Sequence, residues 1–299
     1  MPHDLRNKLV VGISSRALFD LEEENRIFVD EGLDAYEEYQ IAHENVILKP
    51  GTAFPLVKAL HNLNCGDQQL TEIIILSKNS ANTSLRVFNS IAHYGLDISR
   101  AALVGGNSIV PYLGAFQTDL FLSADEKDVQ EAINANIAAG IICTHEDLPI
   151  DSQQEIEQIR IAFDGDAVIF SDEAEQIYQE QGLAAFAEHE RQNAQKPLSD
   201  GPFAKFLKTI SLVQKQFQGE KMPIRTALVT ARNAPAHERV IRTLRANDVR
   251  IDEAFFLGGI PKSDVLKAFG ANIFFDDQPA HTFPASKLVP TARVLSKQI

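Results

Sequence analysis

The chain repeats itself over almost its whole length. Residues 73–125 align without a gap with residues 226–278, 153 positions later, and the matched pairs include Arg86 with Arg239 and the Gly-Gly dipeptide at 105–106 with that at 258–259. Residues 9–19 parallel residues 160–170 at a shift of 151. Two unrelated segments rarely share residues in the same order with the same gaps, so we infer a duplication of one unit.

Each copy has the pattern of an α/β unit. Apolar runs predict buried strands, and amphipathic stretches such as 236–246 predict the helices between them. Strands that alternate with helices form a parallel sheet covered on both faces. A polar stretch at 144–158 separates the copies. We therefore predict two α/β units, 1–150 and 151–299, each with a parallel, Rossmann-like sheet.

Composition excludes several classes of protein. The formal net charge is −13, from 41 acidic and 28 basic residues, which disfavours a nucleic-acid partner but is compatible with a small phosphorylated substrate. Cys65 and Cys143 are too few for a disulfide framework and show no zinc spacing. The start of the chain lacks the pattern of a signal peptide, and no apolar run is long enough to cross a membrane. We expect a cytoplasmic protein whose oligomeric state, a homo-oligomer included, stays open.

Polar side chains and a polar turn follow the predicted strands of the second copy, where ligands bind in parallel sheets. The residues are Asp164, Asp166, Thr230, Ala231, Lys262, Asp276 and Asp277. Two carboxylates one residue apart on an extended chain point in similar directions, so one can attack while the other handles a proton. The Thr230 hydroxyl, the amides that begin at Ala231 and the Lys262 ammonium can bind phosphate oxygens. Asp276 and Asp277 suit a hard cation with oxygen ligands.

These four ordered motifs resemble those of the haloacid-dehalogenase superfamily of phosphohydrolases. A closer resemblance, to the cytosolic 5'-nucleotidase I family, covers almost the whole chain. It rests on SSRALFDLEEEN (14–25), NSIAHYGLDISRAALVGG (89–106), PYLGAFQTDLFLSA (111–124), FDGDAVIFSDEAE (163–175) and VTARNAPAHERVIRTLR (229–245). The resemblance implies a tandem pair of haloacid-dehalogenase folds that acts on nucleoside monophosphates.

The resemblance also implies a role for each motif. Asp164 would be the nucleophile that forms an aspartyl-phosphate, and Asp166 would protonate the leaving oxygen and then activate water. Mg²⁺ would be held by Asp164, the backbone carbonyl of Asp166, and Asp276, with Asp277 in reach. Thr230 and Lys262 would bind the phosphoryl group, with Lys267 as the alternative lysine.

The superfamily inserts a cap between its first two motifs, which corresponds to about 171–222 here. We expect this cap to supply contacts to the nucleoside. The candidate substrate residues, in the cap and beside the second motif, are Arg232, Asn233, Phe203, Lys205 and Lys208.

The first copy lacks the catalytic groups. In the alignment, Ile13 and Ser15 stand opposite the two motif aspartates, Ser123 and Ala124 stand opposite the acidic pair, and Ile109 stands opposite Lys262. We predict a catalytically degenerate half that serves architecture. A less favoured alternative is that Ser14, Ser15, Arg16, Ser77 and Lys78, gathered at its strand ends, bind an anion or a nucleotide as an effector.

The residues alone leave three functions open. The first is a magnesium-dependent 5'-nucleotidase, and the second is a phosphatase for another small phosphomonoester such as a sugar phosphate. The third is a non-catalytic nucleotide-binding regulator, which the intact pair Asp164 and Asp166 disfavours. Base preference and the choice between ribose and deoxyribose cannot be deduced from these motifs.

Overall fold

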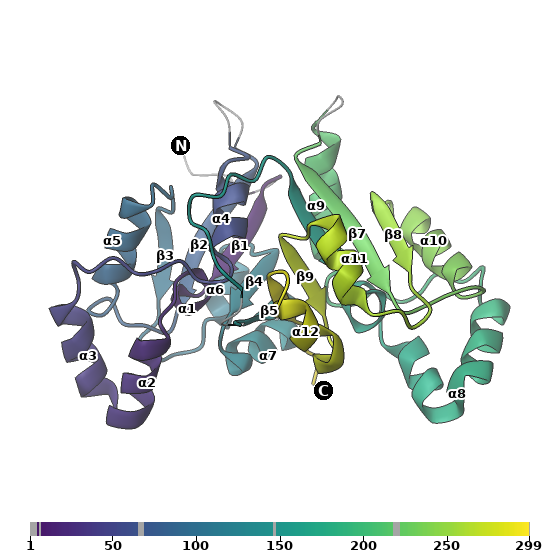
Figure 1. The fold of residues 1–299 in the computed structure, drawn as a ribbon, viewed down its shortest axis with the longest axis horizontal. Helices are drawn as coiled ribbons and strands as arrows, with labels where there is room; N and C mark the ends of the chain where they lie inside the picture. The colour runs from purple at the N-terminus through teal and green to yellow at the C-terminus, as the bar shows by residue number, and fades with distance from the viewer. Residues whose placement is uncertain (1–4, 6, 65–68, 146–147, 218–221, 299) are drawn as a thin grey trace.

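One ten-stranded sheet runs through the computed structural model, in the order β3-β2-β1-β4-β5-β10-β9-β6-β7-β8 (Figure 1). The structure describes residues 5, 7–64, 69–145, 148–217 and 222–298, so the predictions for Cys65 and for the first four residues lie outside it. The strands are β1 (Leu9–Ile13), β2 (Thr71–Ser77), β3 (Arg100–Leu103), β4 (Leu120–Ser123), β5 (Ala138–Cys143), β6 (Ile159–Phe163), β7 (Ile224–Thr230), β8 (Glu253–Phe256), β9 (Ile273–Asp276) and β10 (Thr291–Arg293). The chain is therefore a mixed α/β protein with a mostly parallel sheet, compatible with the expected Rossmann-like fold.

Both halves of the sheet have the same strand order. The first reads β3-β2-β1-β4-β5 and the second β8-β7-β6-β9-β10, and neighbouring strands within each half are parallel. Strands β1, β2, β4, β6, β7 and β9 are buried almost throughout. This burial explains their continuous apolar runs, because parallel strands are covered on both faces. The edge strands β3 and β8 are more exposed.

The two halves meet at an antiparallel join between β5 and β10. Thr291, Ala292 and Arg293 pair with Cys143, Ile142 and Ile141 in that order. Helices reinforce the join, because α4 (Phe54–His61) of the first half contacts β6 and α9 (Ala204–Lys215) of the second contacts β1. The predicted ranges 1–150 and 151–299 stay predictions, but the sheet itself passes from one range to the other without a break.

The remaining helices surround the sheet and project from it. They are α1 (Ser15–Leu18), α2 (Glu22–Glu31), α3 (Leu33–Ala42), α5 (Leu85–His93), α6 (Val110–Ala115), α7 (Glu126–Asn134), α8 (Glu173–Gln192), α10 (His237–Ala246), α11 (Lys262–Phe269) and α12 (Pro279–Ser286), with a π-helical turn at Gly165–Ile169. Within the described ranges, every helix is too short or too polar to cross a lipid bilayer.

A helical hairpin projects from each half, downward in Figure 1. Helices α2 and α3 form the first, with Gly32 at the turn, and α8 forms the second, with a kink at Gly182. Both glycines have a positive φ, 91° and 80°, a conformation that side chains disfavour. The expected cap at about 171–222 is thus only partly a projecting element. Helix α9 instead lies on the sheet, with Phe206 and Leu207 in the core, and residues 218–221 lie outside the described ranges.

Strand register corrects one detail of the sequence alignment. The Ser14 amide donates to Leu122, and the Asp164 amide donates to Phe275, the residue equivalent to Leu122. Ser14, not Ile13, therefore occupies the position of Asp164. Ser14 and Asp164 are 150 positions apart, so the alignment shift of 151 holds only after the π-helical turn. In that turn the second half has one extra residue, and Ala167 adopts a φ of 58°.

Candidate active site

A lysine and two aspartates meet at the carboxyl ends of β6 and β9. The Lys262 Nζ lies 2.8 Å from Asp164 Oδ1 and 2.7 Å from Asp276 Oδ2. All three residues are at most 5% exposed. Lys262 opens α11, whereas Lys267 on the same helix is exposed. The structure thus brings Lys262, not the alternative lysine, to the two motif aspartates.

Burial and charge oppose each other in this cluster. Burial raises the pKa of Asp164 well above its ordinary value, against the pull of Lys262, and the neighbouring Asp276 adds to the rise. For Lys262, burial lowers the pKa but the carboxylates of Asp164 and Asp276 outweigh it, so the pKa is raised. The ammonium therefore stays charged. An ionised Asp164 needs further positive charge beside it.

The Asp166 carboxylate faces Arg232, from the loop after β7. Arg232 Nε lies 2.8 Å from Asp166 Oδ2, and Nη2 lies 2.6 Å from Oδ1. Arg232 Nη1 contacts Glu190 Oε2 of the projecting helix α8 at 2.5 Å. Arg239 binds the other oxygen of Glu190 at 2.7 Å. Through these contacts the hairpin is tied to the first motif.

Thr230 ends β7 directly beside the first motif. A Cβ on Gly165 would lie 3.4 Å from Thr230 Oγ1, an ordinary van der Waals contact, so the first motif packs directly beside Thr230. Thr230 is buried and its hydroxyl accepts a hydrogen bond from the Arg232 amide at 3.2 Å. Ala231 follows on the exposed surface. This arrangement offers a hydroxyl and a following loop at the site edge, as expected for a phosphate-binding group.

Acidic groups that could bind a cation lie next to Lys262. Asp164, Asp276 and His281 each offer a ligand atom within 4.8 Å of the others. The Oδ1 atom of Asp277 is buried and has no hydrogen-bond partner among the described residues. Burial, together with Asp276 and Glu175, raises the pKa of Asp277 to about 7. Crowded carboxylates with an orphaned oxygen fit a hard divalent ion such as Mg²⁺, which prefers oxygen ligands.

The expected substrate residues have different surroundings. Arg232 lies in the site, and Asn233 is exposed beside Gly258. Phe203 is fully buried and packs 4.7 Å, between ring centroids, from Phe275 in the core beneath the site. It presents no surface to a substrate, so the structure does not support its role as a nucleoside contact.

The two lysines from the same stretch also lie outside the cluster. Lys208 pairs with Asp200 at 3.1 Å on the surface, and Lys205 lies 3.9 Å from Asp119 at the junction of the halves. Both extend from α9, which covers the sheet. The prediction that they contact substrate assumed that α9 belonged to the cap.

Sequence reasoning assigned neither Glu190 nor His281 to the site. The His281 Nδ1 lies 3.2 Å from Asp276 Oδ2, five positions along the chain from its partner and on the adjoining helix. This short spacing from Asp276 is the sequence feature that could have placed His281 at the site. Glu190 is one of many acidic residues on α8, and its only distinction, burial at 1% exposure, is a property of the folded chain.

The chain is similar to known proteins over its full length. A family model described as 5'-nucleotidase matches residues 1–299. Cytosolic 5'-nucleotidase 1B of Homo sapiens is 42% identical over 299 residues, covering 96% of this chain and 48% of that protein. The chain therefore spans about half the length of this relative. No solved structure is significantly similar to it.

Proposed function

This chain belongs to the 5'-nucleotidase family, and from that premise we propose that it hydrolyses nucleoside 5'-monophosphates to nucleoside and phosphate. The observation that carries the proposal is the meeting of Asp164, Lys262 and Asp276 at one sheet edge, with Asp166 two residues from Asp164. These groups come from three separate segments, and each is the residue that its motif predicts.

The proposed chemistry divides between the two aspartates. Asp164 attacks phosphorus and the bond to the ribose oxygen breaks, which leaves an aspartyl-phosphate. Asp166 gives the leaving oxygen its proton and takes one back from the water that hydrolyses the intermediate. Lys262 and Thr230 stabilise the charge on the phosphoryl oxygens.

The carboxylate cluster would hold Mg²⁺ through Asp164, the Asp166 carbonyl, Asp276 and Asp277. When bound, the ion supplies positive charge that neutralises the phosphoryl oxygens. The buried, unpaired oxygen of Asp277 and the raised pKa of Asp164 support this assignment. Burial, and next to it the neighbouring Asp276, raise the pKa of Asp164, so a bound cation would favour its ionised form.

We further propose that the fold arose by tandem duplication and that the α8 hairpin is the cap. The shared strand order and the paired hairpins support the duplication. The contact from Glu190 through Arg232 to Asp166 supports a hairpin that acts at the site. The name of the human relative favours a cytosolic enzyme.

Phosphate release tests the function. The substrates are the common nucleoside 5'-monophosphates and a panel of sugar phosphates, each with Mg²⁺ and with a chelator. We expect phosphate release from the nucleoside monophosphates when Mg²⁺ is present. Faster phosphate release from sugar phosphates would instead identify the alternative phosphatase. Asp164→Asn should lose more than tenfold of the rate, or about 1.4 kcal/mol of barrier. A variant with near-normal turnover would remove Asp164 from its role.

The control for that substitution is Ser14→Ala. Ser14 occupies the same position in the first half and caps a helix there, accepting from the Ala17 amide at 3.2 Å. Its loss should lower stability by about 1 kcal/mol without abolishing turnover. Equal losses of activity in both variants would show that disturbed folding, and not missing chemistry, explains the Asp164 result.

A further inference from the structure

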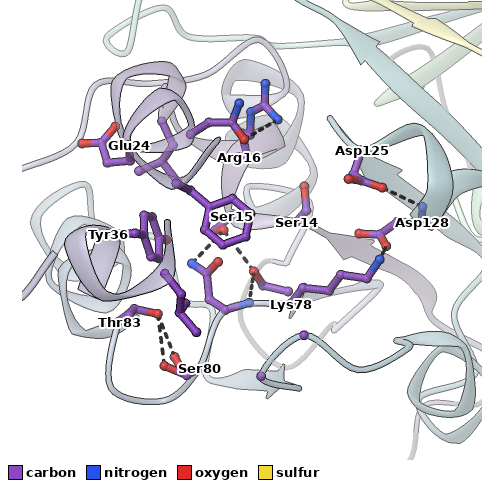
Figure 2. Close-up of a pocket in the computed structure, with 18 of the residues that line it drawn as sticks. Ser14, Ser15, Arg16, Glu24, Tyr36, Lys78, Ser80, Thr83, Asp125 and Asp128 are labelled. Atoms are coloured by element: carbon purple, nitrogen blue, oxygen red, sulfur yellow. Dashed lines mark hydrogen bonds and ion pairs between the residues drawn. The ribbon is translucent and has the colours of Figure 1, made fainter. Parts of the chain in front are cut away.

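A cavity of about 580 Å³ opens in the first half, at the strand ends equivalent to those of the candidate active site (Figure 2). Its volume is within the range of small-molecule sites. Ser14 and Ser77, which line it, occupy the positions of Asp164 and Thr230. Gly105 and Gly106 have positive φ values and place no side chain in its wall. The groups of the reaction are gone, but the space for a ligand is kept.

Neutral hydrogen-bonding groups cover much of this cavity. The Ser15 and Ser77 hydroxyls lie 3.1 Å apart, and Asn79 donates to Ser15 at 3.4 Å. Ser80 and Thr83 hydroxyls lie 3.3 Å apart on the side that Figure 2 shows below Tyr36. Such groups bind hydroxyl and ring nitrogen atoms without needing charge on the ligand.

An aromatic wall stands at one end. Phe28 and Tyr36 line the cavity from the α2–α3 hairpin, with their ring centroids 5.8 Å apart in an edge arrangement. Phe28 is 48% exposed although the Tyr36 ring packs against it. Its exposed ring is suited to stack on a planar ligand.

The charges disfavour a phosphorylated ligand. The two cations among the described residues that line the cavity are already paired, Arg16 with Glu22 at 2.9 Å and Lys78 with Asp128. Asp125 adds a carboxylate beside Lys78 and Asp128 in Figure 2. A phosphate there would meet acidic groups, whereas ribose hydroxyls can donate to them.

We propose that this cavity binds a nucleoside, with its base against Phe28 and Tyr36 and its ribose toward Asp125. The choice of a nucleoside over another neutral ring compound rests on the proposed function, because a nucleoside is the product of that reaction. The anion or nucleotide effector considered from the sequence does not fit these charges.

Calorimetric titration of the full chain tests the proposal, with adenosine, guanosine, cytidine and uridine as probes. Phe28→Ala should weaken binding of the preferred nucleoside about 5- to 150-fold, the range expected for one lost base stack. Val29→Ala, a 70% exposed neighbour outside the cavity lining, should leave it unchanged. Equal affinity in the two variants, or no nucleoside binding below about 1 mM, overturns the proposal.

A second pair of variants separates nucleoside from nucleotide. Asp125→Asn keeps an oxygen to cap α7, where Asp125 accepts from the Asp128 amide at 3.0 Å, but it removes the charge. It should weaken nucleoside binding, while the control Glu126→Gln, the same charge change beside the cavity lining, should not. The 5'-monophosphates are titrated into Asp164→Asn. Monophosphate binding that is tighter than nucleoside binding and weakened by Lys78→Ala would instead establish an anion site.

The two proposals fail separately. Phosphate release by the wild-type chain reports on the second half alone, and Phe28 lies outside every group assigned to the reaction. Turnover without Phe28-dependent nucleoside binding would overturn the cavity proposal only. Nucleoside binding that depends on Phe28, in a chain that releases no phosphate, would overturn the proposed function only.

Discussion

Replacing Glu190 with glutamine should affect both stability and turnover. The Glu190 carboxylate is 1% exposed and lies between two guanidinium groups, 2.5 Å from Arg232 and 2.7 Å from Arg239. Glutamine keeps the shape but removes the charge and turns an NH₂ group toward a cation. Both arginines are at most 5% exposed, so water cannot replace the lost partner.

The magnitude follows from this burial. Breaking a buried ion pair by removing one partner costs about 3–5 kcal/mol. At roughly 2 °C of melting temperature per kcal/mol for a chain of this size, the shift is about 6–10 °C. Glu188→Gln is the control, because Glu188 and its partner Arg191 are both more than half exposed and an exposed pair contributes about 0–1 kcal/mol.

Turnover separates the hairpin contact from general destabilisation. Glu24→Gln breaks the buried pair that the equivalent arginine makes in the first half, Arg86 with Glu24 at 2.5 Å. It should lower the melting temperature similarly. Only Glu190 reaches a catalytic candidate, because Arg232 links it to Asp166, whereas the first half has Asn79 at the Arg232 position. Glu190→Gln should therefore lower kcat about tenfold, or ~1.4 kcal/mol, well below the melting temperature.

The assay combines thermal unfolding by circular dichroism with phosphate release at saturating substrate. Equal kcat for Glu190→Gln and Glu24→Gln would refute the link from the hairpin to Asp166. A melting temperature for Glu190→Gln as high as that of Glu188→Gln would refute the burial argument itself.

Three further results are expected. Lys262→Met should reduce phosphate release about 100-fold or more, while Lys267→Met, on the exposed side of the same helix, should leave the rate unchanged. A chelator should abolish phosphate release and excess Mg²⁺ should restore it; full activity in the chelator would contradict the carboxylate site. Burial raises the pKa of Asp119, so the folded chain keeps that proton to higher pH than the unfolded chain. Stability therefore falls as pH rises through the window above 3.8. Asp119→Asn should remove this slope, since Asn272 makes the equivalent contact in the second half, accepting from a strand amide at 2.7 Å; an unchanged slope in melting temperature against pH would contradict it.

The strands and the site aspartates could be predicted because they are encoded locally. Continuous apolar runs mark buried parallel strands, and polar residues at their ends mark the edge where ligands bind. Lys262 and Asp276 are 14 positions apart, yet the strand pattern alone predicted their meeting. The repeat then predicted the same strand order twice, since equal patterns fold alike.

The features that could not be predicted depend on contacts between distant segments. β10 is only three residues long, so its sequence pattern is too short to predict a strand there or its pairing with β5. The extra residue in the π-helical turn could not be located from the sequence. Leu18-Phe19 and Ile169-Phe170, which follow the turn, match at a shift of 151, and this shift was carried back into the strand before the turn. The position of α9 depends on its contacts with the distant strands of the sheet, so the sequence of the helix does not specify it, and the substrate roles of Lys205 and Lys208 stay predictions.

The antiparallel join between β5 and β10 means that each half covers a sheet edge of the other half. Hydrogen-bonding groups along an unpaired inner strand invite pairing with a foreign chain, and here each half covers that row on its neighbour. Cutting the chain in the loop between β5 and β6 would leave β5 in one fragment and β10 in the other, each with an unpaired edge. Separately expressed fragments should therefore self-associate or aggregate. Mixed together, they should reassemble into one sheet, which makes this molecule a natural scaffold for a split reporter.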